Sequence, residues 1–319
     1  MINKKNNLFS AVFFFAIVAL LLSSCSDNDI PVPPDDDTVD ASEGKVAVWR
    51  SDKAGLLKIA EEPELIPYES ANDFDVSVAI DETTEYQSME GFGAALTGSS
   101  AYVIQTHLSE AEQDQLLNDL FNTETGIGIS FIRLIIGASD FSLNDFTYND
   151  LAVNQSDISQ NNFDISREEE YLIPLLQKIL VINPNLKIMA TPWSAPAWMK
   201  DNEKLKEGGR LKSTLYESYS TYLIKYIQAM GNYNIPIHTI TVQNEPLYAA
   251  PYISMEMSSE EQKVFIRDHL GPQLEANNID TKIIIYDHNW DDINYPLDIL
   301  SDETAKGYIE GTAFHCYAG

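Results

Sequence analysis

Glu245 is the residue of this sequence whose position most clearly suggests chemistry. It follows an apolar run and stands between Asn244 and Pro246. A carboxyl group at the end of a buried strand, in partly apolar surroundings, can have a raised pKa and act as a general acid. The same tripeptide also fits a carboxylate that only caps the next segment. The tripeptide alone therefore leaves both interpretations open.

Polar and aromatic side chains follow other apolar runs in the same way. Carboxylates, amides, imidazoles and indoles without a basic cluster suit a sugar site, because aromatic rings stack on the C–H face of a pyranose and polar groups bond its hydroxyls. Trp193 and Trp198 can be core aromatics, but two indoles with prolines between them favour a sugar platform. The stretches concerned are 138–142, 192–198, 244–246, 287–290 and 315–317.

Several other kinds of site are disfavoured by spacing. His288 and His315 lack the HExxH or similar spacing of a metal site, so we expect neither a metal nor another cofactor. Ser194 is not part of a GxSxG nucleophile elbow. No GxGxxG motif or P-loop follows an apolar run, which argues against a nucleotide enzyme. With only Cys25 and Cys316 in the chain, a disulfide framework or cysteine zinc site is excluded.

The charge of the chain limits its partners. Asp and Glu outnumber Lys and Arg by 49 to 20, which gives a formal net charge of −29 over 319 residues. A nucleic acid or an anionic lipid surface would be repelled, so a neutral partner fits better. The simplest interpretation of the charge itself is a solvated acidic surface.

The N-terminal region is interpreted as a targeting segment and a tether. In residues 1–24, two lysines precede an apolar stretch shorter than the roughly 20 residues of a membrane span, which predicts a signal peptide. The sequence LSSC at 22–25 resembles a bacterial lipobox, so Cys25 would carry the lipid. Residues 25–44 contain many acids and three prolines, as in an extended spacer. We expect an outer-membrane lipoprotein, exposed at the cell surface and touching the membrane only through Cys25.

The polar strand ends must be positioned by strands and helices, and the sequence predicts where these lie. Residues 45–85 contain short alternating runs typical of antiparallel strands. Beyond them, apolar strands alternate with helices, which predicts a parallel α/β sheet that is either doubly wound or closed into a barrel. Six strands are expected, near 91–95, 131–136, 187–191, 239–243, 282–286 and 312–317.

Three helices are expected to begin with a capping box, in which a serine and a glutamate three residues later bond each other's backbone. These serines are Ser109, Ser166 and Ser258. Pro174 is expected to kink the second helix, and Gly271-Pro272 is expected to end the third.

Five motifs in order resemble glycoside hydrolase family 30, whose members include glucosylceramidase-like enzymes. Each motif alone is weak, but their order over about 230 residues makes the resemblance specific. The motifs are EGFGAA at 90–95, IR at 132–133 with SDFS at 139–142, TPWSAPAWMK at 191–200, QNEP at 243–246 and FHCY at 314–317.

The resemblance implies a (β/α)8 TIM barrel over residues 86–319, with six of its eight strands present, and a flanking β-sandwich that begins in residues 45–85. It implies a retaining mechanism with two glutamates, in which Glu245 is the acid/base and the nucleophile lies beyond residue 319. It also implies substrate binding by Asp140, Trp193, Asn244, His315 and Tyr317. Cys316 departs from the tryptophan often found there, and we expect a small buried residue.

Because two strands would be missing, the chain is expected to be a fragment of a longer gene product, inactive by itself. Within the family, the stretches 193–200 and 287–290 most resemble bacterial β-1,6-glucanases, which implies a β-glucan substrate. Glucosylceramidase, β-glucosidase and β-xylosidase activities of the same family stay open. So does a noncatalytic glycan-binding lipoprotein.

Overall fold

The structure, a computed structural model, describes residues 49–50, 53–54, 60–61, 81 and 83–319. The chain divides into two units, residues 1–85 and 86–319. In the first unit, strands β1 (Trp49–Arg50) and β2 (Ala60–Glu61) pair antiparallel. The expected signal peptide, the lipid site at Cys25, the tether and most of the alternating runs expected at 45–85 lie outside the described residues.

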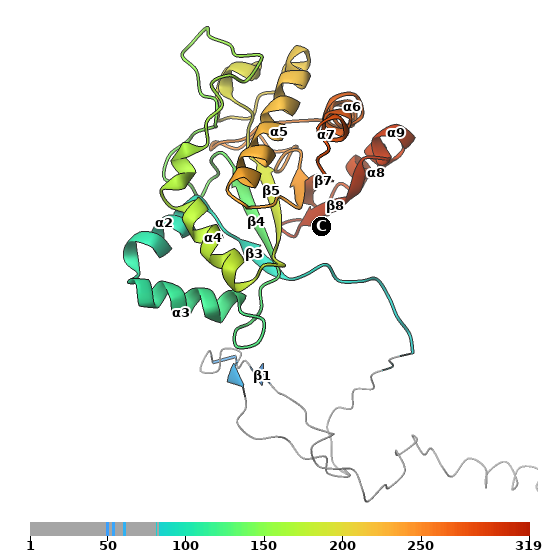
Figure 1. Cartoon of the computed structure of the whole chain (residues 1–319). Coiled ribbons are helices and arrows are strands. Elements are labelled where there is room, and N and C mark those ends of the chain that lie inside the picture. The colour runs from blue at the N-terminus through green and yellow to red at the C-terminus, as the bar shows by residue number, and fades with distance from the viewer. Residues whose placement is uncertain (1–48, 51–52, 55–59, 62–80, 82) are drawn as a thin grey trace, which may run out of the picture. The chain divides into compact units, whose positions relative to one another are not determined.

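The second unit is built on a six-stranded parallel sheet with the order β3-β4-β5-β6-β7-β8. Each strand pairs with the next one along the chain, whereas a doubly wound sheet reverses its strand order. This unbroken order identifies a partial TIM barrel, as the family resemblance implies (Figure 1). The strands are β3 (Gly93–Ala95), β4 (Phe131–Ile136), β5 (Lys187–Pro192), β6 (Thr239–Thr241), β7 (Lys282–Asn289) and β8 (Ile309–His315).

Alternation along the strands separates the core from the site. In β4, Ile132 and Leu134 are buried in the main hydrophobic cluster, while the intervening Arg133 lines a cleft on the other face. Successive strand residues point to opposite faces, so one strand serves both the core and the site. Among the described residues, β3 and β8 each pair on one side only, which leaves the sheet open at both edges.

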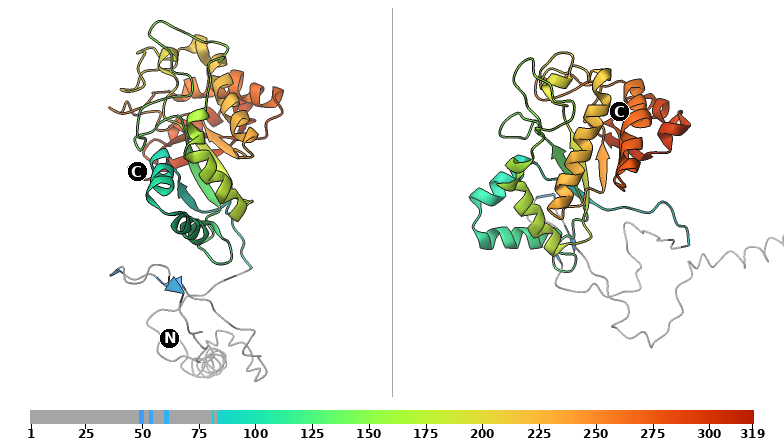
Figure 2. Two further views of the ribbon diagram at one scale, coloured as in Figure 1. Left: turned by 60° about the vertical axis from the view of Figure 1, so that its left-hand side comes forward. Right: turned by 45° about the horizontal axis from the view of Figure 1, so that its top comes forward.

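Helices connect the strands and surround the curved sheet, as the two views of Figure 2 show. Among the described residues, no helix is long and apolar enough to cross a membrane. The helices are α2 (Gly98–His107), α3 (Glu110–Phe121), α4 (Leu172–Ile182), α5 (Tyr216–Asn232), α6 (Ser259–Phe265), α7 (Gly271–Ala276), α8 (Asn294–Leu300) and α9 (Glu303–Lys306).

Two of the three predicted capping boxes are confirmed. At the start of α3 and α6, the hydroxyls of Ser109 and Ser258 accept from the backbone N–H of the glutamate three residues later. The carboxylate of that glutamate accepts from the backbone N–H of the serine. The prediction at Ser166 is wrong: Ser166–Glu169 forms a short 3₁₀ turn, and α4 starts at Leu172. Pro174 therefore lies in the first turn of α4, where its missing N–H has no helical partner to lose, and it need not kink the helix.

The predicted stop at Gly271-Pro272 is also wrong. Helix α6 continues through a π-helical turn, Ile266–Leu270, into α7. Pro272 falls at the N-terminal start of α7. A proline is tolerated in a first helical turn, and the wider π turn before it absorbs the change in hydrogen bonding.

Helix α5 carries a stack of buried tyrosines on its inner face. Tyr219, Tyr222 and Tyr226 are spaced three and four residues apart and are fully buried. Tyr148, from the loop after β4, stacks on Tyr226 with ring centroids 5.7 Å apart and planes inclined by 12°. Tyr219 and Tyr222 stack at 5.8 Å and 15°. These rings form a large part of the core that holds α5 in place.

Candidate active site

A cleft of about 980 Å³ lies at the carboxyl ends of the strands. Because the carboxyl ends of parallel strands meet on one face of a barrel, residues distant in sequence converge there. All six residues predicted to bind or cleave a substrate line this cleft: Asp140, Trp193, Asn244, Glu245, His315 and Tyr317.

Glu245 stands where the chain leaves β6 and is fixed by its backbone. Its φ of 46° places it in the left-handed region, which is unfavourable for a residue with a side chain. Its backbone N–H donates to the carbonyl of Asp287 at 2.9 Å, which ties the two strand ends together. The side chain is 15% exposed, so its carboxylate is accessible from the cleft but mostly shielded.

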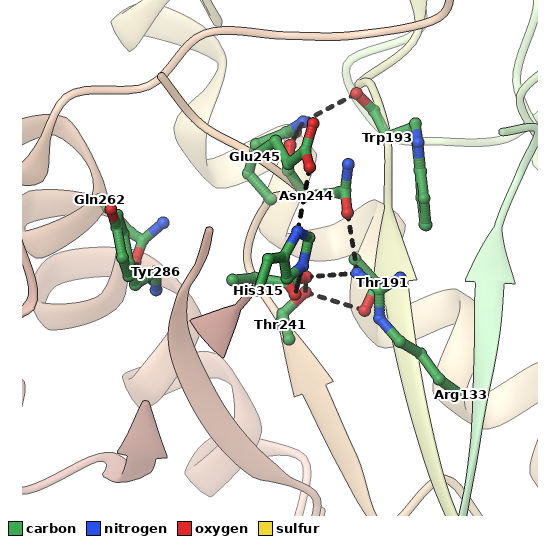
Figure 3. Close-up of polar contacts among 11 residues, drawn as sticks. Arg133, Thr191, Trp193, Thr241, Asn244, Glu245, Gln262, Tyr286 and His315 are labelled. Atoms are coloured by element: carbon green, nitrogen blue, oxygen red, sulfur yellow. Dashed lines mark hydrogen bonds and ion pairs between the residues drawn. The ribbon is translucent and has the colours of Figure 1, made fainter. Parts of the chain in front are cut away.

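His315 lies between two carboxylates, one on each side of its ring. Its Nδ1 is 3.0 Å from Oε1 of Glu245, and its Nε2 is 2.8 Å from Oδ1 of Asp287. Figure 3 shows the imidazole between Glu245 and Thr241. An ionised carboxylate only accepts hydrogen bonds, so both ring nitrogens must donate when both carboxylates are ionised. This arrangement favours the imidazolium form of His315.

Asp287 is the most enclosed carboxylate of the site. Its side chain is 2% exposed, and Oδ2 accepts from Nη2 of Arg133 at 2.7 Å and from the hydroxyl of Thr241 at 2.8 Å. Thr241 lies 3.0 Å from Thr191, hydroxyl to hydroxyl, inside the barrel. A buried carboxylate can stay ionised when it is paired with a cation and hydrogen-bonded, and Asp287 meets both conditions.

The pKa values follow from these contacts. The hydrogen bond from His315 lowers the pKa of Glu245, whereas one of the two interpretations of the sequence allowed a raised pKa. Burial alone would raise the pKa of Asp287, but Arg133 and His315 lower it to about 2. Burial alone would lower the pKa of His315, but its bonds to Asp287 and Glu245 raise it to about 9.

Arg133 also organises the neighbours of Glu245. The same Nη2 donates to Oδ1 of Asn244 at 2.8 Å, which leaves the amide NH₂ group as the end that Arg133 does not engage. The guanidinium lies 4.8 Å from the ring centroid of Trp193, within cation–π distance. Trp193 is only 8% exposed. A sugar therefore reaches only a limited part of this indole.

Two expectations for residues near the cleft are wrong. Trp198 does not line the cleft; its Nε1 donates to the carbonyl of Asn149 at 3.0 Å and its ring packs on the core. Cys316 is exposed and free rather than buried. It belongs to the stretch that follows β8, whose outer side has no paired strand among the described residues. Tyr317 and Asp140 are exposed as well.

Lys200 supports the loop that carries Trp193. Its side chain is fully buried, and Nζ donates to Ser194 Oγ at 3.0 Å and to the carbonyls of Ser254 and Leu205 at 2.7 and 3.3 Å. All three ammonium protons thus have an acceptor. Burial nevertheless lowers the pKa of Lys200 to about 7. The ammonium fastens three loop segments beside the cleft.

Asp287 and Arg133 belong to the site but were not predicted as site residues from the sequence. Both residues occur in stretches that the sequence pattern indicated, Arg133 at 132–133 and Asp287 at 287–290. Asp287 was expected to follow the strand, whereas it lies within β7. Its partners are far away in sequence, and no local pattern shows that they meet. Among the described residues, no group of three or more His, Cys, Asp and Glu side chains is arranged to hold a metal ion.

The chain is similar to several known glycosidases. It is 36% identical to an endo-1,6-β-D-glucanase of Neurospora crassa over 237 residues, which cover 73% of this chain and 48% of that protein. It is 30% identical to the lysosomal acid glucosylceramidase of Mus musculus over 249 residues, covering 73% and 46%. A solved endo-β1,6-glucanase superposes with a TM-score of 0.76 at 35% identity, covering 86% of this chain and 61% of that one.

The chain spans about half the length of the curated relatives it matches. The family description that matches, over residues 89–319, is the glycosyl hydrolase family 30 TIM-barrel domain. This match covers the whole parallel sheet and every residue of the cleft. The chain therefore belongs to glycosyl hydrolase family 30.

Proposed function

We propose that this chain is part of a retaining β-glycosidase that cleaves β-1,6-glucan, with Glu245 as its acid/base. The observation that carries the proposal is the carboxylate of Glu245, held by His315 at 3.0 Å and presented to a cleft at the strand ends. The similarity to endo-1,6-β-glucanases supports the choice of linkage.

The other cleft residues have roles consistent with a bound sugar. The amide of Asn244, oriented by Arg133, donates to the 2-hydroxyl of the sugar whose bond is cleaved. Asp140 and the exposed part of Trp193 hold the sugar at the nonreducing end. His315 and Tyr317 lie beside the reacting carbon.

A retaining glycosidase needs a second carboxylate about 5 Å from the first, and Asp287 does not suit this role. Its oxygens are occupied by Arg133, Thr241 and His315. We place the nucleophilic glutamate beyond residue 319, on a strand that pairs with the free side of β8. A second negative charge there would raise the pKa of Glu245, which His315 lowers in the present arrangement, and so prepare it to donate a proton.

The test is hydrolysis of β-1,6-glucan by the complete gene product, with β-1,3- and β-1,4-glucans for comparison. Glu245→Gln should reduce turnover by roughly a hundredfold or more, because general acid–base catalysis is lost. The loss should be smaller on a glycoside whose leaving group needs no protonation. Glu124→Gln, an exposed glutamate outside the cleft, is the matched control.

The same assay separates the alternatives. Release from a glucosylceramide, a simple β-glucoside or a β-xyloside, with none from β-1,6-glucan, would reassign the substrate within the family. Binding of β-glucan that survives in Glu245→Gln, with no sugar released by the unsubstituted protein, would refute the enzyme and favour a glycan-binding protein.

We also propose that the protein is an outer-membrane lipoprotein, anchored through Cys25 and exposed at the cell surface. The lipobox-like sequence at 22–25 and the acidic, proline-containing tether after it support this proposal. A surface location suits an enzyme whose substrate is a polymer outside the cell.

A further inference from the structure

Strand β7 contains a bulge at the residue that contacts His315. In the pairing with β8, Tyr286 lies opposite Ala313 and His288 lies opposite Phe314, so Asp287 has no partner on β8. Tyr286 and Asp287 have φ values of 71° and 60°, in the left-handed region. Two such residues in succession are unfavourable, and surrounding contacts must hold them there.

Two contacts hold this bulge from opposite sides. Behind the sheet, Gln262 of α6 is fully buried, and its Oε1 accepts from the backbone N–H of Tyr286 at 3.0 Å. Figure 3 shows Gln262 beside Tyr286, away from the other labelled residues. On the cleft side, the carbonyl of Asp287 accepts from the N–H of Glu245 at 2.9 Å. The bulge thus joins a buried glutamine of α6 to the backbone of the acid/base.

The bulge also aims the carboxylate of Asp287 into the barrel. There it meets Arg133, Thr241 and His315, at 2.7, 2.8 and 2.8 Å. Together with Glu245, the ionised groups are two cations and two anions, so the cluster is neutral when His315 is an imidazolium. A neutral His315 would leave two carboxylates against one guanidinium in a mostly buried site, which is electrostatically unfavourable.

The charged and titratable groups around His315 come from four strands. Glu245 and Asp287 contact it directly, Arg133 lies behind Asp287, and His288 and Tyr317 have ring centroids 6.3 and 6.2 Å away. The two carboxylates favour its proton, while Arg133 opposes it. Removing one of the two directly bonded carboxylates should therefore change its protonation more than any other substitution.

We infer that Asp287 is a positioning residue that keeps both ring nitrogens of His315 protonated, so that the ring donates a hydrogen bond to Glu245. The bulge, held by Gln262, aims the carboxylate of Asp287 at His315. The inference rests on the proposed function for its catalytic meaning. An imidazolium stabilises Glu245 in the ionised state that follows proton donation, until Glu245 takes a proton from the incoming water. Asp287 itself touches neither the departing oxygen nor the reacting carbon.

The test is nitrogen-15 NMR of labelled histidine in a protein that contains residues 1–319, which include five histidines. His315→Gln assigns the signal. We expect both ring nitrogens of His315 to be protonated at pH 7, with a titration midpoint near 9. In Asp287→Asn, the midpoint should fall by more than about one pH unit, because a carboxylate partner becomes a neutral amide.

Two further variants keep the test decisive. Gln262→Met removes the acceptor of the Tyr286 N–H at similar side-chain length, and it should lower the midpoint by a smaller amount. Asp157→Asn removes another buried carboxylate, bonded to Asn149 and Asn162 outside the cleft, and should leave His315 unchanged. Unchanged signals from His107, His238 and His269, which lie outside the cleft, would show that a variant has kept its fold.

A neutral His315 at pH 7 in the unsubstituted chain would overturn the inference, whether or not the variants fold. An unchanged midpoint in Asp287→Asn would overturn the role of Asp287, and an unchanged midpoint in Gln262→Met would overturn that of the bulge. None of these measurements needs turnover. Failure to hydrolyse β-1,6-glucan would therefore refute the proposed function and leave the NMR result standing.

Discussion

At the residue scale, the site depends on balanced charge more than on apolar surroundings. The sequence left a raised pKa open for Glu245 as one of two interpretations, yet His315 lowers the pKa of this carboxyl. The sequence placed Glu245 and His315 at separate strand ends, and their contact is long-range, 70 residues apart. Residue types at strand ends were therefore predictable, because they follow local runs. Their pairing was not, because it depends on how distant strands register.

Lys200 provides a prediction about pH at this scale. Its pKa is about 7 in the fold and near 10.5 when unfolded. Between these values the unfolded chain holds more protons, so the contribution of Lys200 to stability increases as pH rises from about 7 to 10.5. Urea unfolding of the protein and of Lys200→Met should show a difference in unfolding free energy that grows in favour of the unsubstituted protein over this range.

A comparison with Lys178→Met, a lysine whose side chain is 39% exposed, controls for the general effect of alkali. If the difference for Lys200→Met stayed constant or decreased from pH 7 to 10.5, the ammonium would keep its proton throughout, and the three acceptors would outweigh its burial.

At the element scale, strand positions were predictable from sequence, while helix ends and strand irregularities were less so. Apolar runs located all six strands of the parallel sheet because burial on both faces leaves a continuous signal. Gly271-Pro272 is a local signal for a helix end, but packing against the barrel extends the helix through a π turn. The bulge at Tyr286 and Asp287 has no glycine to announce it, since Gln262 and Glu245 stabilise it from outside the strand.

Gly93 allows a test of the pairing between β3 and β4. A Cβ at this position would lie 1.5 Å from the carbonyl oxygen of Phe131, its partner in the parallel ladder. Gly93→Ala must therefore separate the two strands, and it should lower the free energy of unfolding by about 2 kcal/mol or more. The urea midpoint should fall accordingly.

Gly98→Ala is the matched control. Gly98 begins α2, and a Cβ there meets no atom within 4 Å. Alanine is favoured over glycine in a helix by up to about 1 kcal/mol, so this variant should be as stable as the original or slightly more stable. Equal midpoints for both variants would mean that β3 does not pair tightly with β4.

At the scale of the whole molecule, sequence pattern left a doubly wound sheet and a barrel equally open. Only the strand order distinguishes them, because both folds are made from the same alternating elements. The family resemblance, carried by motifs such as QNEP at 243–246, predicted the barrel. The net charge of −29 is compatible with the neutral polymer that we propose as substrate, because such a polymer is not repelled by an acidic surface.

The proposed anchor predicts where the protein is found in the cell. Cys25→Ala should move it from the membrane fraction to the soluble fraction of the host, because stable anchoring depends on the acyl chains of the lipidated cysteine. Cys316→Ala, the only other cysteine, should stay with the membrane. Membrane retention and unchanged incorporation of labelled fatty acid in Cys25→Ala would contradict the anchor.

The tyrosine stack behind the sheet gives the protein an optical signal of its own. Burial raises the pKa of Tyr148, Tyr219, Tyr222 and Tyr226 well above the usual range of a phenol. In alkaline solution, exposed tyrosines become phenolates, which absorb in the near ultraviolet. These four tyrosines keep their protons and do not contribute to the phenolate absorbance. When the chain unfolds at such a pH, the four ionise together. The increase in phenolate absorbance would therefore report the unfolding of the barrel core without any dye or label.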